Sequence, residues 1–241
     1  MLPMAPSNLI DIGSRFLRMD DGTGYLLVAV DLETGRVLRF DVAPRQERAA
    51  WEGFLGTLGA VLPLPPRGFI HPGNPTLEQA LDAVFPGVPR QLCTRHFLSS
   101  LYQYLRSFEE PGAPPGNAEI RFYRAVVQLL NCSFRDRQEG LYASLISTLE
   151  FGSPRLEDTL KWLRERLPLL TAHFFVAGLP RESRTADRIL DELIFTLKAS
   201  SVPLSRPSAI EIARRHIPEI ESAVRAVAPA VEVQRGFVAR I

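Results

Sequence analysis

Apolar residues follow a strand-like pattern through the first part of the chain. The stretch from Leu9 to Met19 alternates between apolar and polar residues, and Tyr25 to Val30 is a continuous apolar run. Alternation indicates a half-buried strand, whereas a short apolar run indicates a strand that is buried on both faces. Turn-forming residues separate these runs, and Val37 to Val42 supplies a third strand. The pattern therefore predicts three antiparallel strands at the start of the chain.

Helices then alternate with short strands. Residues 45–58 place apolar side chains at helical spacing, and a short strand follows at residues 68–70. An amphipathic helix over residues 77–85 leads through a Pro-Gly turn to a strand that ends at Cys93, where another helix begins. This order predicts an α/β fold with a mixed sheet and flanking helices.

Beyond a Pro- and Gly-rich break at residues 108–118, the pattern becomes helical only. Segments with helical periodicity are expected at residues 119–131, 137–149 and 156–170. A later helix carries the apolar stripe Leu190, Leu193, Ile194 and Leu197, and a short basic helix is expected at residues 208–216, with residues 218–227 as its candidate continuation. Residues 231–241 alternate weakly and are expected to form a strand or a tail. The break is the expected internal boundary.

Several motifs in this order resemble one known family. A helix that ends in Val-Phe-Pro-Gly at residues 84–87 is followed by a Cys-x-x-His motif at Cys93 and His96, and Arg184-Thr185 lies further on. These motifs resemble the catalytic core of DDE transposases of the Mutator-like and bacterial insertion-sequence group. The resemblance implies an RNase-H-like core, formed by residues 1–107 and 169–241. It also implies that an all-helical insertion, residues 108–168, interrupts this core.

The same resemblance implies which residues form the site. In that family, acidic side chains hold two divalent metal ions that activate the attacking oxygen and stabilise the leaving one. Asp11 matches the first acid, His71 stands at the position of the second, and the third falls on Asp191 or Glu192. Asp11 and His71 are the expected metal ligands, with Mg²⁺ or Mn²⁺ as cofactor if the site is active. A histidine removes one negative charge from such a site, so the site is either decayed or adapted to a softer metal.

Three functions follow from this pattern. The first is a transposase-derived protein with impaired catalysis that acts in nucleic-acid binding or assembly. The second is an active metal-dependent DNA nuclease or strand-transferase, and the third is an interaction domain that forms a homodimer through the helical insertion. Cys93 and His96 are expected to support the active site. The basic residues expected to contact DNA are Arg184, Arg206, Arg214 and Arg215.

Composition adds little to these alternatives. The 241-residue chain has a formal net charge of +1, so no overall field attracts it to nucleic acid. Its two cysteines do not make a disulfide framework, and we identify no signal peptide. No apolar run reaches the roughly 18 residues of a membrane span, so we expect no membrane partner and a cytoplasmic location.

Overall fold

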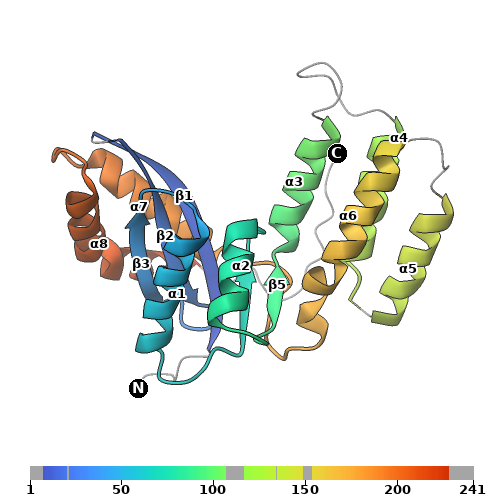
Figure 1. The fold of residues 1–241 in the computed structure, drawn as a ribbon, viewed down its shortest axis with the longest axis horizontal. Coiled ribbons are helices and arrows are strands. Elements are labelled where there is room, and N and C mark those ends of the chain that lie inside the picture. Colours follow the sequence, from blue (N-terminus) through green and yellow to red (C-terminus); the bar gives the residue numbers. More distant parts are fainter. Residues whose placement is uncertain (1–7, 21, 107–116, 134, 149–153, 228–241) are drawn as a thin grey trace.

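A computed structural model describes residues 8–20, 22–106, 117–133, 135–148 and 154–227. The described chain forms a five-stranded mixed sheet with helices on both faces and a further group of helices beside it (Figure 1). The expected α/β class is confirmed. The predicted break at 108–118 falls largely outside the described residues, and the predicted strand or tail at 231–241 lies entirely outside them.

The sheet has the strand order β3-β2-β1-β4-β5. Its strands are β1 (Leu9–Met19), β2 (Gly22–Asp31), β3 (Val37–Ala43), β4 (Gly68–His71) and β5 (Arg90–Leu92). The first three strands pair antiparallel as predicted, β4 pairs parallel to β1, and β5 pairs parallel to β4. Strand β1 is therefore central, and it carries side chains toward both layers of helices.

Two layers of helices cover the sheet. Helices α1 (Arg48–Val61) and α2 (Pro75–Val84) pack on one face, and α7 (Thr185–Ala199) and α8 (Arg206–Val227) pack on the other. Alternation along β1 divides its residues between these layers. Ile10 and Ile12 join the core under α1 and α2, whereas Gly13 lies under α7. A Cβ atom at Gly13 would lie 2.9 Å from Leu190 Cδ1, so any larger residue at this crossing would force α7 side chains to shift.

The remaining helices form a core of their own beyond β5. They are α3 (Thr94–Arg106), α4 (Asn117–Leu130), α5 (Arg135–Thr148) and α6 (Pro154–Leu170), followed by the short 3₁₀ helix η1 (Ala172–Phe174). Polar contacts connect this group to α2 and to the sheet. Arg166 Nη1 of α6 lies 2.6 Å from Glu78 Oε1 of α2. The buried amide of Gln91 on β5 donates to Leu170 O at 3.0 Å and accepts from the His173 N–H at 2.9 Å.

Candidate functional site

Asp11 lies on the central strand, beneath the first turn of α7. Its carboxylate oxygen Oδ2 accepts a hydrogen bond from the Ala186 N–H at 2.9 Å and another from Ser183 Oγ at 2.5 Å. Asp11 therefore caps α7 from another element, placing a carboxylate at the positive end of that helix. Burial raises the pKa of Asp11 to about 6, although these two hydrogen bonds act in the opposite direction, and the negative charge of Asp187 adds to the rise. Most Asp11 side chains are still ionised at pH 7.

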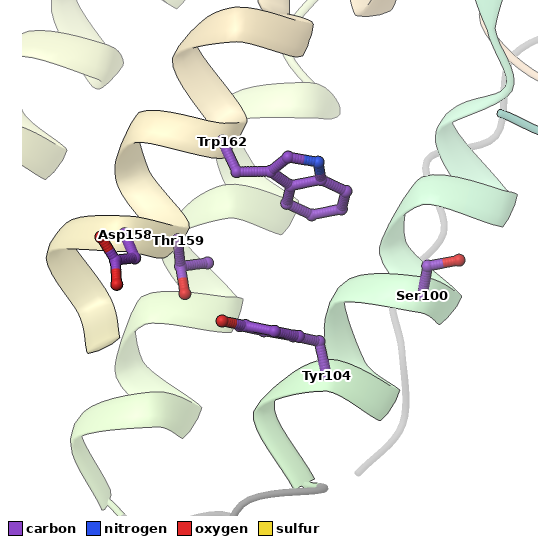
Figure 2. Close-up of a pocket in the computed structure, with 5 residues that line it drawn as sticks. All are labelled: Ser100, Tyr104, Asp158, Thr159 and Trp162. Atoms are coloured by element: carbon purple, nitrogen blue, oxygen red, sulfur yellow. The ribbon is translucent and has the colours of Figure 1, made fainter. Parts of the chain in front are cut away.

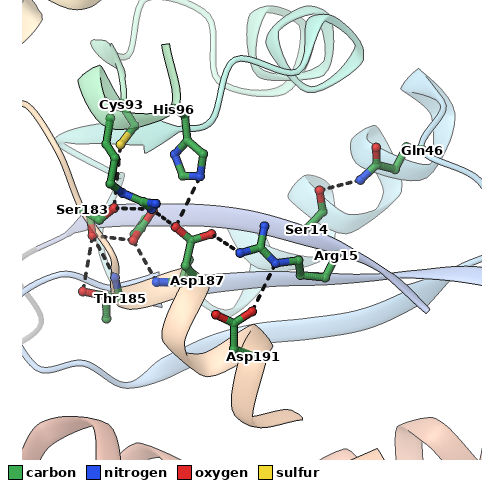
Figure 3. Close-up of polar contacts among 12 residues, drawn as sticks. Ser14, Arg15, Gln46, Cys93, His96, Ser183, Thr185, Asp187 and Asp191 are labelled. Carbon is green, nitrogen blue, oxygen red and sulfur yellow. Dashed lines mark hydrogen bonds and ion pairs between the residues drawn. The ribbon is translucent and has the colours of Figure 1, made fainter. Parts of the chain in front are cut away.

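Asp187, in the first turn of α7, is the acidic residue that lies near Asp11. Three cationic side chains surround its carboxylate (Figure 3). Arg15 Nη2 lies 3.2 Å from Oδ1, His96 Nε2 lies 3.3 Å from Oδ2, and Arg95 Nη2 forms a further ion pair with Oδ2. Burial alone would raise the pKa of Asp187, but the hydrogen bond and charge of His96, with Arg95 and Arg15, outweigh it and lower the pKa below 3.8.

His96 is the part of the Cys-x-x-His motif that faces this carboxylate. Burial acts to lower its pKa, but the hydrogen bond to Asp187 and the neighbouring Cys93 thiol outweigh burial and raise the pKa to about 9. The imidazole is therefore protonated at neutral pH. Cys93 precedes α3 and is buried, and its thiol donates to Ser183 O at 3.7 Å. The motif thus fixes the start of α3 to the segment that leads into α7.

His71 lies on the other side of the sheet from Asp11. Asp11 pairs with Ile70 in the β1–β4 ladder, and paired residues of parallel strands share a face. The next residue, His71, consequently points toward α2, where its Nδ1 atom lies 4.0 Å from Glu78 Oε1 and accepts from the Gly73 N–H at 3.2 Å. The structure therefore does not bring together the two expected metal ligands.

His71 is also held in its neutral form. It is 1% exposed, and burial, together with the charges of Arg90 and Arg166, lowers its pKa to about 3. Since Nδ1 accepts a hydrogen bond, the proton resides on Nε2, which is buried and has no hydrogen-bond partner among the described residues.

The two candidates for the third acid lie at the surface. Asp191 is one helical turn beyond Asp187; its side chain is 65% exposed and pairs with Arg15 Nε at 3.3 Å. Glu192 is exposed as well. Sequence reasoning missed Asp187, although its position two residues after Thr185 places it in the first turn of the helix. A carboxylate there was a detectable signal, because acidic residues are favoured near helix N-termini.

The basic residues predicted to contact DNA lie on two different helices. They are Arg184, Arg206, Arg214 and Arg215. Arg184 is exposed at the start of α7, whereas the other three belong to α8, which begins after α7 ends. Those three are ion-paired within the chain: Arg206 lies 3.6 Å from Asp41, and the other two lie within 3.7 Å of Glu211. Their charges are thus partly compensated.

These residues do not fit a two-metal centre. The buried Asp11 oxygen is occupied by hydrogen-bond donors, Asp187 is surrounded by cations, and His71 faces another layer. Across the described parts of the chain, no group of three or more His, Cys, Asp or Glu residues is arranged to hold a metal ion. The arrangement instead forms a compact charge network between β1, α3 and α7, which we call the Asp187 network: Asp11, Arg15, Arg95, His96 and Asp187.

Comparison with known proteins does not assign the chain to a family. No family model matches it, and no curated protein matches it at a significant level. Within the described residues, none of the helices combines the length and the apolar character needed to cross a bilayer.

Proposed function

We propose that this protein is an RNase-H-like module of transposase ancestry that has lost strand-transfer catalysis and acts in nucleic-acid binding or assembly. The strand order β3-β2-β1-β4-β5, with an antiparallel first half and a parallel second half, supports an RNase-H-like core. So does the location of Asp11 on the central strand, next to a carboxylate on the helix that follows the helical group. The motifs at residues 84–96 support the transposase ancestry.

The loss of catalysis rests on the partners of Asp187. Two divalent ions would supply positive charge at such a centre. Here Arg15, Arg95 and the protonated His96 supply it, and they do so from positions fixed by the fold. A metal ion would have to displace the charged side chains that surround Asp187. It would also have to displace the two hydrogen-bond donors of Asp11, whose carboxylate would then no longer cap α7. Both changes would reduce the free energy of unfolding. The Asp187 network therefore has a structural role at the position where the resembled family has its catalytic site.

A plasmid-nicking assay with Mg²⁺ and with Mn²⁺ tests this proposal. Wild type, Asp11→Ala and the surface variant Asp191→Asn are compared on supercoiled and single-stranded DNA. We expect no metal-dependent cleavage by any of the three proteins. Cleavage by wild type and Asp191→Asn that disappears in Asp11→Ala would overturn the proposal.

The binding role needs its own measurement. Fluorescence anisotropy with labelled DNA at low and moderate salt should show weak, salt-sensitive binding, because three of the four arginines predicted to contact DNA are partly neutralised by ion pairs. Sedimentation velocity measures self-association, which the homodimer hypothesis requires. A chain that neither binds DNA nor self-associates would contradict a role in binding or assembly through these surfaces.

An active enzyme is the second candidate, and one observation favours it. Asp11 and Asp187 approach closely enough that the charge of Asp187 contributes to the raised pKa of Asp11. Coupled carboxylates are a common feature of catalytic sites. The nicking assay decides between the two candidates.

A further inference from the structure

A pocket of about 410 Å³ opens between α3 and α6, in the helical group. Ser100 and Tyr104 line it from α3, and Asp158, Thr159 and Trp162 line it from α6. The α3 residues lie roughly one and two turns beyond His96, so the pocket is distinct from the Asp187 network. Its volume is in the range of roughly 300–1,000 Å³ typical of small-molecule sites.

Aromatic rings form the walls of this pocket. Tyr104 and Trp162 project from facing helices toward the same space (Figure 2). The Trp162 indole also stacks on Phe97, with ring centroids 4.8 Å apart and an interplanar angle of 21°. Because Phe97 is buried in the helical core, this stacking fixes the indole before any ligand arrives. A wall held in this way loses little conformational entropy on binding.

The pocket also carries a negative charge. Asp158 is exposed at its edge, and no ion pair among the described residues includes this carboxylate. Aromatic faces attract cations through their quadrupole, and a nearby carboxylate adds a direct charge interaction. Anions are disfavoured by both features. The lining hydroxyl groups of Ser100 and Thr159 add polar atoms without adding charge.

We propose that this pocket binds an organic cation of the ammonium type, with Tyr104 and Trp162 against its alkyl groups and Asp158 as counter-charge. The cation belongs either to a free small molecule or to a methylated lysine side chain, which present the same chemistry. This site is independent of the Asp187 network and of the proposed loss of catalysis. It gives the helical group a binding function of its own.

Intrinsic tryptophan fluorescence can report binding at this pocket. The chain has two tryptophans, and Trp51 of α1 is fully buried in the core between that helix and the sheet, so a ligand-dependent change reports Trp162. The probes are choline and its uncharged isostere 3,3-dimethylbutan-1-ol. We expect a saturable change with choline. The affinity for the alcohol should be lower by a factor of about ten or more, because only choline gains the cation–π and charge interactions. Equal responses to both compounds, or no saturable change with choline, would overturn the proposal.

Variants locate the site and control for folding. Asp158→Asn should weaken choline binding about two- to fivefold, as expected for an exposed charge interaction. The matched control Glu157→Gln removes the same charge from the neighbouring exposed position, and it should leave binding unchanged. Tyr104→Leu should weaken binding about two- to thirtyfold. Circular dichroism must show a folded chain in each case, and a folded Asp158→Asn protein with wild-type choline affinity would contradict the assignment.

A second arm identifies the source of the cation. Peptides with one trimethyl-lysine are compared with the same peptides carrying unmodified lysine or norleucine. Tighter binding of the trimethylated peptide than of choline supports the site and assigns the cation to a side chain. If all peptides bind more weakly than choline, the result supports the site and assigns the cation to a free small molecule.

Discussion

Replacing Asp187 with asparagine removes the anion on which the network converges, while leaving a side chain of nearly the same size. The first consequence is on His96. Burial acts to lower its pKa, and the hydrogen bond to Asp187, the neighbouring Cys93 thiol and the charge of Asp187 together raise it. In Asp187→Asn, the pKa of His96 should fall from about 9 toward 6.5, although Cys93 still acts to raise it. Arg15 and Arg95 also lose their shared partner.

The magnitude follows from the two pKa values. The difference between 6.5 and about 9 corresponds to roughly 3 kcal/mol, at about 1.4 kcal/mol per pH unit. Since the folded state holds the higher pKa, this stabilisation is fully present below pH 6.5 and is lost as the pH rises through about 9. The wild-type free energy of unfolding should therefore fall by about 2–3 kcal/mol across this window, allowing for the partial exposure of His96.

Chemical denaturation at the two ends of this pH window measures the effect, and NMR of the His96 imidazole measures the pKa directly. Asp187→Asn should lose most of the pH dependence. Asp191→Asn, which removes a more exposed partner of Arg15, should retain it and leave the His96 pKa unchanged. The reasoning is refuted if His96 titrates near 6.5 in wild type, or if Asp187→Asn keeps both the high pKa and the wild-type pH dependence.

Other substitutions test the fold around the site. Gly13→Ala should cost about 1–3 kcal/mol in thermal or chemical denaturation, because the new methyl group would lie 2.9 Å from Leu190 Cδ1; an unchanged midpoint would contradict this close packing. Asn74→Ala should cost about 1 kcal/mol, because the Asn74 side chain accepts from two N–H groups at the start of α2, whereas Asn74→Asp should retain most of the stability. His71 has a lowered pKa, so its contribution to stability is lost as the pH falls below 6.5 toward about 3. Relative to His71→Asn, wild type should lose about 2 kcal/mol between pH 6.5 and about pH 5, and parallel stability curves would show that His71 is not held neutral.

The sheet was largely predictable because local patterns determine it. Alternation over Leu9–Met19 and the apolar run inside β2 are consequences of the strand period and of burial on both faces. The Pro75 position and the Asn74 cap similarly mark the start of α2. Each of these signals lies within a few residues of the element that it specifies.

The site was less predictable because its geometry depends on contacts between distant segments. Whether His71 faces Asp11 is decided by the register between β1 and β4, which pairs Asp11 with Ile70. The partners of Asp187 come from β1 and α3, at positions that no local pattern connects to α7. The family resemblance placed the third acid at Asp191 or Glu192, whereas the turn of α7 that lies against Asp11 is the first one, which contains Asp187.

Binding of Mn²⁺ followed by NMR tests most directly whether protein cations have taken the place of metal ions at Asp11 and Asp187. Paramagnetic Mn²⁺ broadens signals of nearby nuclei, so the His96 imidazole and the Ala186 amide report on the site. We expect no selective broadening of either signal at metal concentrations that broaden exposed carboxylates elsewhere. Selective broadening of both signals that disappears in Asp11→Asn, a variant that retains an oxygen able to cap α7, would show a functional metal centre and contradict the structural role assigned to the network.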